Sequence, residues 1–162
     1  MKKWLSVLIA AVLAAAVALI LWPSAPKAAD FSLVDLNGKT VNQTHLQDKV
    51  TLINFWYPSC PGCVSEMPKL IKMAHDYQNQ SAFQIIGIAL PYDPESSVRN
   101  YAATRNLPFQ VAIDTNNQVG KAYGVEVAPT SVLVNRSGEV VKTFVGEPDF
   151  GALYRQVDVL LK

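Results

Sequence analysis

Two cysteines separated by two residues are the strongest chemical feature of the sequence. Cys60 and Cys63 are the only cysteines among 162 residues, and they form the motif Cys-Pro-Gly-Cys. This spacing makes too tight a loop for an ordinary stabilising disulfide. A zinc site would need two more ligands, and haem attachment would need a histidine where Val64 stands. We therefore predict a redox-active dithiol that uses neither a metal nor a cofactor.

The neighbouring residues indicate how the two thiols are positioned. Residues 50–56 have the pattern of a buried strand, and from Pro61 onward the apolar residues follow a helical period. Cys60 should therefore lie at a helix N-terminus, where free N–H groups and the helix dipole stabilise a thiolate. We expect Cys60 to be the exposed, attacking thiol. Cys63, one turn along the same face, should resolve the mixed disulfide.

The rest of the chain predicts strands that alternate with helices. Residues 31–41 should form a hairpin with a two-residue turn at Asn37-Gly38. Further strands are expected at 84–90, 109–114, 130–135 and 139–145, and further helices at 94–107, 117–124 and 150–161. This order indicates an α/β fold in which helices flank a mixed central sheet.

The first 22 residues predict a membrane anchor. Lys2 and Lys3 precede a mostly apolar, uncharged segment at 4–22 that ends in tryptophan on both sides. At about 1.5 Å per residue, this segment is just long enough to cross a hydrocarbon core of about 30 Å. A cleaved signal peptide is the alternative. Because positive residues stay in the cytoplasm, the rest of the chain should be exported.

Composition limits the remaining function classes. The chain carries 14 Lys and Arg against 13 Asp and Glu, and three of the basic residues precede residue 30. The domain that follows is therefore slightly acidic, which argues against a nucleic-acid partner. Its length suits one domain with an appendage. We expect an anchor at 1–22, a linker at 23–29 and a monomeric domain at 30–162.

Four motifs of the chain occur together in one known family. They are NFWYPSCPGC at 54–63, Glu66 with Pro68, the run Tyr123-Gly124-Val125 and the run Val127-Ala128-Pro129-Thr130. With these motifs the chain resembles the membrane-anchored, exported TlpA/ResA-type thioredoxin-like family, near the cytochrome c maturation reductases. The resemblance covers residues 30–162 and implies a thioredoxin-like sandwich with an N-terminal hairpin and a central insert around 91–114.

The resemblance also implies roles for individual residues. Glu66 would accept the proton of the buried thiol, although a solvated Glu on the helix surface is the alternative. The Ala128–Pro129 bond would be cis and packed against the disulfide, which leaves the backbone from Ala128 to Thr130 free to pair with a substrate strand. Trp56 would lie beneath the site, either in contact with substrate or as simple packing.

The function implied is that of a thiol:disulfide oxidoreductase in the cytoplasmic membrane, with its domain in the periplasm or outside. It would reduce disulfides of exported proteins, such as apocytochrome c or a methionine sulfoxide reductase, and a transmembrane electron donor would recharge it. A peroxiredoxin-like peroxidase is one alternative, but its motif would place a cysteine where Ser65 stands. A non-catalytic binding module on the same fold is the other alternative.

Overall fold

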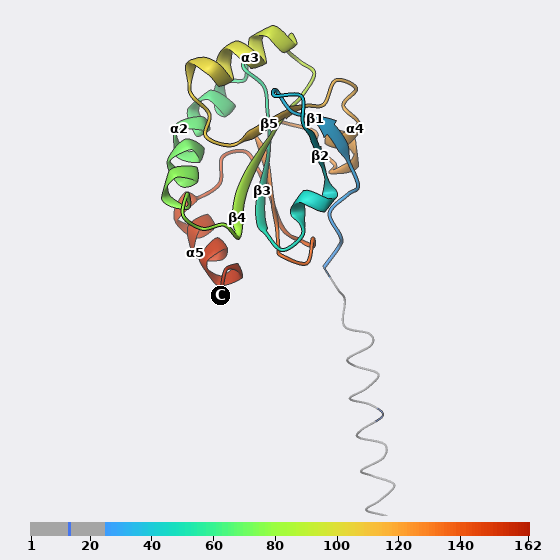
Figure 1. Cartoon of the computed structure of the whole chain (residues 1–162), viewed down its shortest axis with the longest axis vertical. Helices are drawn as coiled ribbons and strands as arrows, with labels where there is room; N and C mark the ends of the chain where they lie inside the picture. The colour runs from blue at the N-terminus through green and yellow to red at the C-terminus, as the bar shows by residue number, and fades with distance from the viewer. Residues whose placement is uncertain (1–12, 14–24) are drawn as a thin grey trace, which may run out of the picture.

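The computed structural model describes Leu13 and residues 25–162, so the predicted anchor segment at 4–22 lies outside the described residues except for Leu13. Figure 1 shows the arrangement of the elements. In chain order they are β1 (Ser32–Val34), β2 (Thr40–Asn42), the 3-10 helix η1 (Gln43–Leu46), β3 (Val50–Trp56), α2 (Pro61–Asp76), β4 (Phe83–Ala89), α3 (Glu95–Thr104), β5 (Gln110–Ile113), α4 (Gln118–Ala122), β6 (Thr130–Val134), β7 (Val140–Val145) and α5 (Phe150–Leu160). Only η1 was not anticipated from the sequence.

The main sheet has five strands in the order β5-β4-β3-β6-β7. Strands β3, β4 and β5 run parallel to one another, whereas β6 is antiparallel to both β3 and β7. The predicted mixed central sheet is therefore confirmed. β3 lies in the middle and is buried along its whole length, as its unbroken apolar pattern predicts.

The two faces of the sheet are covered by different elements. Leu52 and Trp56 belong to the core cluster under α2, α3 and α5. Ile53 and Phe55 point to the opposite face and pack with the hairpin, η1 and α4, because successive strand residues alternate between the faces. Figure 1 shows these layers on either side of the sheet. Residues 91–114, the predicted insert, form α3 and the edge strand β5.

The N-terminal hairpin is present, but the predicted two-residue turn is wrong. Val34 pairs with Thr40, and the backbone N–H of Asp35 donates to the carbonyl of Lys39 at 2.8 Å. The loop therefore encloses three residues, and Gly38 has a φ of +80° that favours glycine. The Asp35 carboxylate sets this length, because it accepts the backbone N–H groups of both Asn37 and Lys39 at 2.8 Å.

Part of the predicted linker is bound to the domain. The N–H of Val140 donates to the carbonyl of Pro26 at 2.8 Å, and the N–H of Ala28 donates to the carbonyl of Gly138 at 2.9 Å. Between them, Lys27 forms an ion pair with Glu139 at 3.5 Å. We call residues 26–28 the strap. Among the residues described by the structure, no helix combines the length and the apolar character needed to cross a membrane.

Candidate functional site

The two cysteines form a disulfide at the start of α2. Cys60 and Cys63 are bonded to each other with their Cα atoms 5.2 Å apart. Cys60 is the N-cap residue of the helix, and its Sγ accepts the backbone N–H of Cys63 at 3.1 Å. Pro61 occupies the first turn, where its missing N–H costs nothing. The helix N-terminus thus directs N–H groups toward the sulfur that is expected to carry negative charge.

Cys60 is less exposed than predicted. In the disulfide form only 3% of its surface is accessible, against 1% for Cys63. The expectation of an openly exposed Cys60 is wrong for this state, because Cys60 Sγ faces inward and lies 3.5 Å from the carbonyl oxygen of Ala128. The exposed residues of the motif are Ser59, Pro61 and Gly62.

The Ala128–Pro129 peptide bond is cis, as the family resemblance implied. Pro129 is buried and lies against the Cys-Pro-Gly-Cys turn: a Cβ atom on Gly62 would come within 3.1 Å of Pro129 Cδ. Glycine at position 62 therefore permits the close approach of the two segments. The carbonyl of Pro129 accepts the N–H of Gly146, and this hydrogen bond holds the loop that contains Pro129 to the residue after β7.

Glu66 is fully buried, one helical turn beyond Cys63. Asn54 Nδ2 donates to Ser131 Oγ at 3.0 Å and to Glu66 Oε2 at 3.5 Å. Glu66 Oε1 is buried and has no hydrogen-bond partner. The helix brings Cys63 and Glu66 to the same side because residues three apart are neighbours. Of the two roles left open, the surface carboxylate is thus excluded for Glu66.

Burial raises the pKa of Glu66 to about 7. The hydrogen bonds from Asn54 and Ser131 and the charge of Lys69 act in the opposite direction, whereas the charge of Glu147 adds to the increase. A carboxyl group without water around it favours its neutral form. Glu66 can therefore exchange a proton in the neutral pH range, where an ordinary glutamate is always ionised.

Comparison with known proteins agrees with this geometry. A profile of the Redoxin family matches residues 23–156. The chain belongs to the Redoxin family. Within it, the thiol-disulfide oxidoreductase ResA of Halalkalibacterium halodurans is 35% identical over 120 residues, which cover 74% of this chain and 67% of that protein.

Two solved structures of related proteins are similar to this redoxin. The solution structure of a protein from Neisseria meningitidis assigned to the thioredoxins is 56% identical, with a TM-score of 0.78 over 85% of this chain and 91% of the other. A Chlorobium tepidum protein assigned as thiol:disulfide interchange protein DsbE is 29% identical, with a TM-score of 0.78 over 86% and 99% of the chains. The predicted family, the thioredoxin-like fold and the class of thiol-disulfide oxidoreductase are confirmed.

Two residues predicted to contact substrate lie inside the redoxin domain. Trp56 is fully buried and packs against the ring of Tyr101, with centroids 5.2 Å apart. This placement favours the packing role for Trp56. Thr130 is also buried, and its Oγ1 donates to the carbonyl of Val127 at 2.8 Å. Ala128 is the residue of this loop whose carbonyl directly faces Cys60.

Sequence reasoning missed one residue at the site. Asp93, in the loop between β4 and α3, accepts the backbone N–H of Ser59 at 2.7 Å through Oδ2. Its carboxylate therefore contacts the turn directly before Cys60. No spacing rule connects Asp93 with the cysteine motif, because the two segments meet only in the folded chain.

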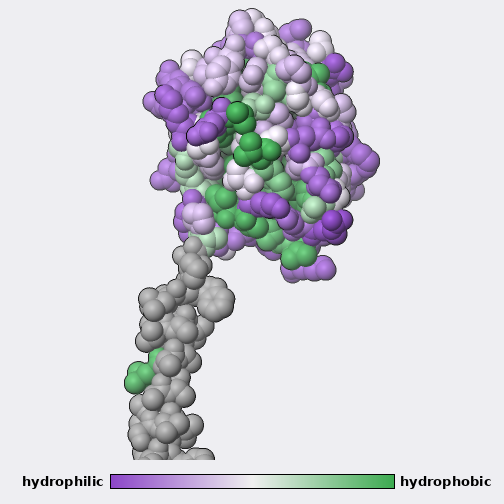
Figure 2. All heavy atoms as spheres, turned by 180° about the vertical axis from the view of Figure 1, so that it is seen from behind, coloured by the Kyte–Doolittle hydropathy of each residue, from purple (hydrophilic) through white to green (hydrophobic). Residues whose placement is uncertain are grey.

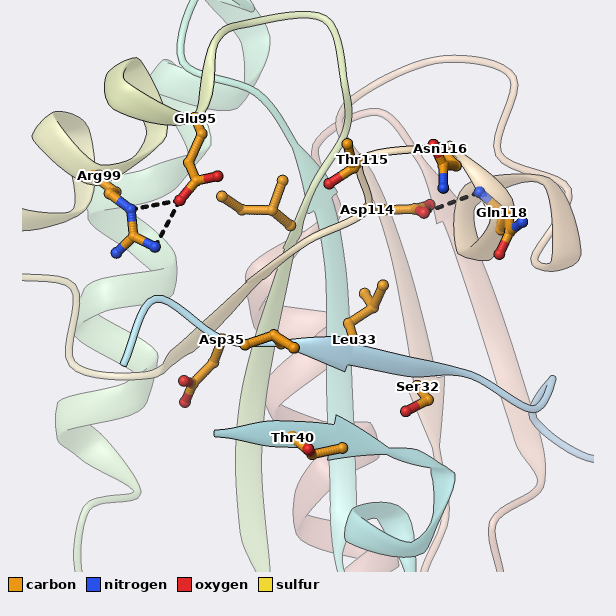
Figure 3. Close-up of a pocket in the computed structure, with 12 residues that line it drawn as sticks. Ser32, Leu33, Asp35, Thr40, Glu95, Arg99, Asp114, Thr115, Asn116 and Gln118 are labelled. Atoms are coloured by element: carbon orange, nitrogen blue, oxygen red, sulfur yellow. Dashed lines mark hydrogen bonds and ion pairs between the residues drawn. The ribbon is translucent and has the colours of Figure 1, made fainter. Parts of the chain in front are cut away.

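A separate cavity of about 380 Å³ lies between the hairpin, α3 and the end of β5 (Figure 3). Its charged side chains already have partners in this redoxin: Glu95 pairs with Arg99 at 2.6 Å, and Asp114 accepts the N–H groups of Gln118 and Gly120. None of the predicted site residues lines it. Figure 2 shows that apolar and polar side chains are interspersed on the face of the domain seen from behind.

Proposed function

We propose that this chain is an exported, membrane-anchored reductase of disulfides in exported proteins. One observation carries the proposal: the Cys60–Cys63 disulfide lies at a helix N-terminus, against the cis Ala128–Pro129 bond and one turn from the buried Glu66. The names of its ResA relatives support the reaction type. The apolar segment at 4–22 supports anchoring in the cytoplasmic membrane, with the domain in the periplasm or outside.

The first step of the reaction uses Cys60. In the dithiol form, the Cys60 thiolate attacks a disulfide of the partner and forms a mixed disulfide, while the other partner sulfur leaves and takes up a proton. The N–H of Cys63, which lies 3.1 Å from Cys60 Sγ, stabilises the attacking thiolate. The backbone at Ala128 aligns the partner as a short strand beside the sulfur.

The second step uses Cys63 and Glu66. Cys63 transfers its proton to the Glu66 carboxylate and attacks Cys60 Sγ. The bond between Cys60 Sγ and the partner sulfur breaks, and that sulfur leaves as a thiolate that takes up a proton. Two electrons pass to the partner, which becomes a dithiol, and the Cys60–Cys63 disulfide is formed. Without the carboxylate a buried thiol holds its proton more tightly, because desolvation disfavours the thiolate.

The partner is a polypeptide with an exposed disulfide. Tyr92 and Val127 are exposed apolar residues that adjoin Asp93 and Ala128, on either side of the cysteine turn. Such side chains suit contact with an extended segment. Apocytochrome c and an exported methionine sulfoxide reductase are the leading substrates, and a transmembrane thiol donor returns the electrons. Pro61 and Gly62 bring no cation to the motif, which favours a reductant over a strong oxidant.

Trapping of mixed disulfides tests this mechanism. We expect the full chain with Cys63→Ser to accumulate covalent adducts through Cys60, because the resolving thiol is missing. The matched variant Cys60→Ser should form none. Both are measured on non-reducing gels of cells that express the anchored protein, with a reducing lane as control.

Equal trapping by the two variants would contradict the assigned roles of Cys60 and Cys63. The reductase direction is tested in the same cells by alkylating free thiols in the wild-type protein. A protein found wholly in the disulfide form during growth would contradict a reductase that is recharged by a donor.

A further inference from the structure

The loop after β4 is fixed beside the cysteine turn by several contacts. The N–H of Leu90 donates to the carbonyl of Trp56 at 2.9 Å, which extends the pairing with β3 one residue beyond the end of β4. The rings of Tyr57 and Tyr92 then pack with centroids 4.9 Å apart. These contacts place Asp93 independently of its own hydrogen bond to Ser59.

We propose that Asp93 is a positioning residue that sets the redox properties of Cys60. Its carboxylate holds the backbone of Ser59 through the 2.7 Å hydrogen bond. Its negative charge disfavours the thiolate at Cys60 and thereby makes the dithiol a stronger electron donor. This inference rests on the proposed reductase function, which it deepens.

Covalent geometry sets an upper limit on the distance between the Asp93 carboxylate and the Cys60 sulfur. Ser59 N and Cys60 Sγ belong to consecutive residues, so the Asp93 carboxylate lies within about 10 Å of the sulfur. At such a separation near a protein surface, one unit charge changes an ionisation equilibrium by a few fold. A reduced pair whose thiolate is disfavoured is less stable relative to its disulfide, so its reduction potential is lower.

In the described part of the chain, further charged groups lie near the dithiol or adjoin its loop in sequence. Glu66 lies on α2 beneath Cys63, and Glu126 precedes Ala128 by two residues. Both carry the same sign as Asp93 when ionised. Lys69, farther along α2, forms an ion pair with Glu147. The Cys60 thiolate is therefore stabilised by helix N–H groups and opposed by carboxylates.

Two substitutions separate the hydrogen bond of Asp93 from its charge. Asp93→Asn keeps an oxygen that can accept the Ser59 N–H but removes the charge, and Asp93→Ala removes both. Asp149→Asn is the matched control, since Asp149 accepts the N–H of Ala152 at the start of α5. Each full-length variant is equilibrated with dithiothreitol mixtures, and the alkylation rate of Cys60 is followed against pH.

We expect Asp93→Asn to shift the equilibrium about three-fold toward the dithiol, which is about 15 mV at about 30 mV per tenfold. The pKa of the Cys60 thiol should fall by about half a unit, and Asp149→Asn should change neither value. Asp93→Ala should show the same shift and, in addition, slower exchange.

An equilibrium and a pH profile unchanged in Asp93→Asn would overturn the inference, whatever Asp93→Ala does, because only the charge was removed. The proposed function fails separately. If the Cys63→Ser trap captures no partner while Asp93→Asn still shifts the equilibrium, the reductase proposal falls and the role of Asp93 stands.

Discussion

At the scale of single residues, the burial of Glu66 costs the folded domain free energy when the carboxyl group is ionised. Its side chain is fully buried, Oε1 has no hydrogen-bond partner, and the contact of Oε2 with Asn54 is long, at 3.5 Å. A buried carboxylate with so few donors is tolerated mainly in its neutral form. The burial that raises the pKa of Glu66 to about 7 also means that the folded domain loses stability when Glu66 ionises.

Glu66→Gln should remove a pH dependence of stability. The pKa of Glu66 is raised from 4.5 to about 7 in the folded state. Between these pH values the folded state binds more protons than the unfolded state, so the free energy of unfolding falls as pH rises. At about 1.4 kcal/mol per pKa unit the loss is roughly 3 kcal/mol. Urea unfolding from pH 4 to pH 8 should show this fall in the wild type and not in Glu66→Gln.

The same variant should slow disulfide exchange about ten-fold near pH 7, because the proton acceptor for Cys63 is absent. Raising the pH should recover much of the rate, since hydroxide can then remove the proton. Glu126→Gln is the control, because it removes a carboxylate from an exposed position near the site. An exchange rate and a pH dependence of that rate identical to the wild type would contradict the role of Glu66 as proton acceptor.

At the scale of elements, Asp35 joins the hairpin to the main sheet. Oδ1 accepts two backbone N–H groups of the loop, and Oδ2 accepts Nε2 of Gln110 on the edge strand β5 at 2.9 Å. Beside it, the N–H of Leu36 donates to the carbonyl of Val111. The hairpin thus covers the open edge of β5, where unpaired backbone groups would otherwise invite another chain.

Asp35→Ala should destabilise the domain by about 2 to 3 kcal/mol at pH 7, because it leaves partly buried N–H groups unpaired. Although burial acts to raise it, the pKa of Asp35 is lowered by its hydrogen bonds with Gln110, Lys39 and Asn37. The carboxylate therefore stabilises the fold above its ordinary pKa, and this contribution is lost as the pH falls through its folded pKa.

Urea unfolding at pH 7 and at pH 3 checks this expectation for Asp35. The difference between Asp35→Ala and the wild type should shrink at the lower pH. Asp30→Ala, at an exposed position in the same region, serves as the control. A difference that is constant with pH would mean that the hydrogen bonds do not depend on the charge.

Periodicity predicted the strands and long helices because their apolar residues face one continuous core. The redox role of the cysteine pair could likewise be predicted from the sequence, since its chemistry lies in a four-residue motif. Contacts between distant segments could not be predicted. Asp93 meets Ser59 across 34 positions, and the Ala128 carbonyl covers Cys60 across 68. These contacts form because the sheet brings the ends of distant loops together. A local sequence pattern carries no information about that arrangement.

At the scale of the whole molecule, the domain core begins after the proposed anchor. Among the described residues, the first large core residue is Phe31, and both core clusters are built from Phe31 and later residues, with Ala28 packed against one of them. Replacing residues 1–22 by a cleavable signal should therefore release a folded, soluble exported protein with the same exchange rates. Membrane fractionation and a thiol assay measure this. A native chain that already fractionates as soluble, with its N-terminus near Ala29, would contradict the anchor.

The strap is bound at the end of the domain that lies opposite the dithiol. Residues 26–28 are bonded to Gly138 and Val140, next to the turn after β6. Val134 at that end of β6 pairs with Thr51 near the start of β3, whereas Cys60 follows the opposite end of β3. In Figure 1 the continuous blue trace begins at the lower right of the domain, on the side of β1 and β2.

With residues 4–22 in the bilayer as proposed, only residues 23–25 remain between membrane and strap, a span of at most about 10 Å. β3 adds about 20 Å between the strap and the dithiol. In this arrangement the Cys60 sulfur lies on the side of the domain that faces away from the lipid. Exported polypeptides can then reach this side of the domain from the aqueous phase, whereas a membrane-embedded donor needs a thiol-bearing segment that projects from the bilayer by about the height of the domain.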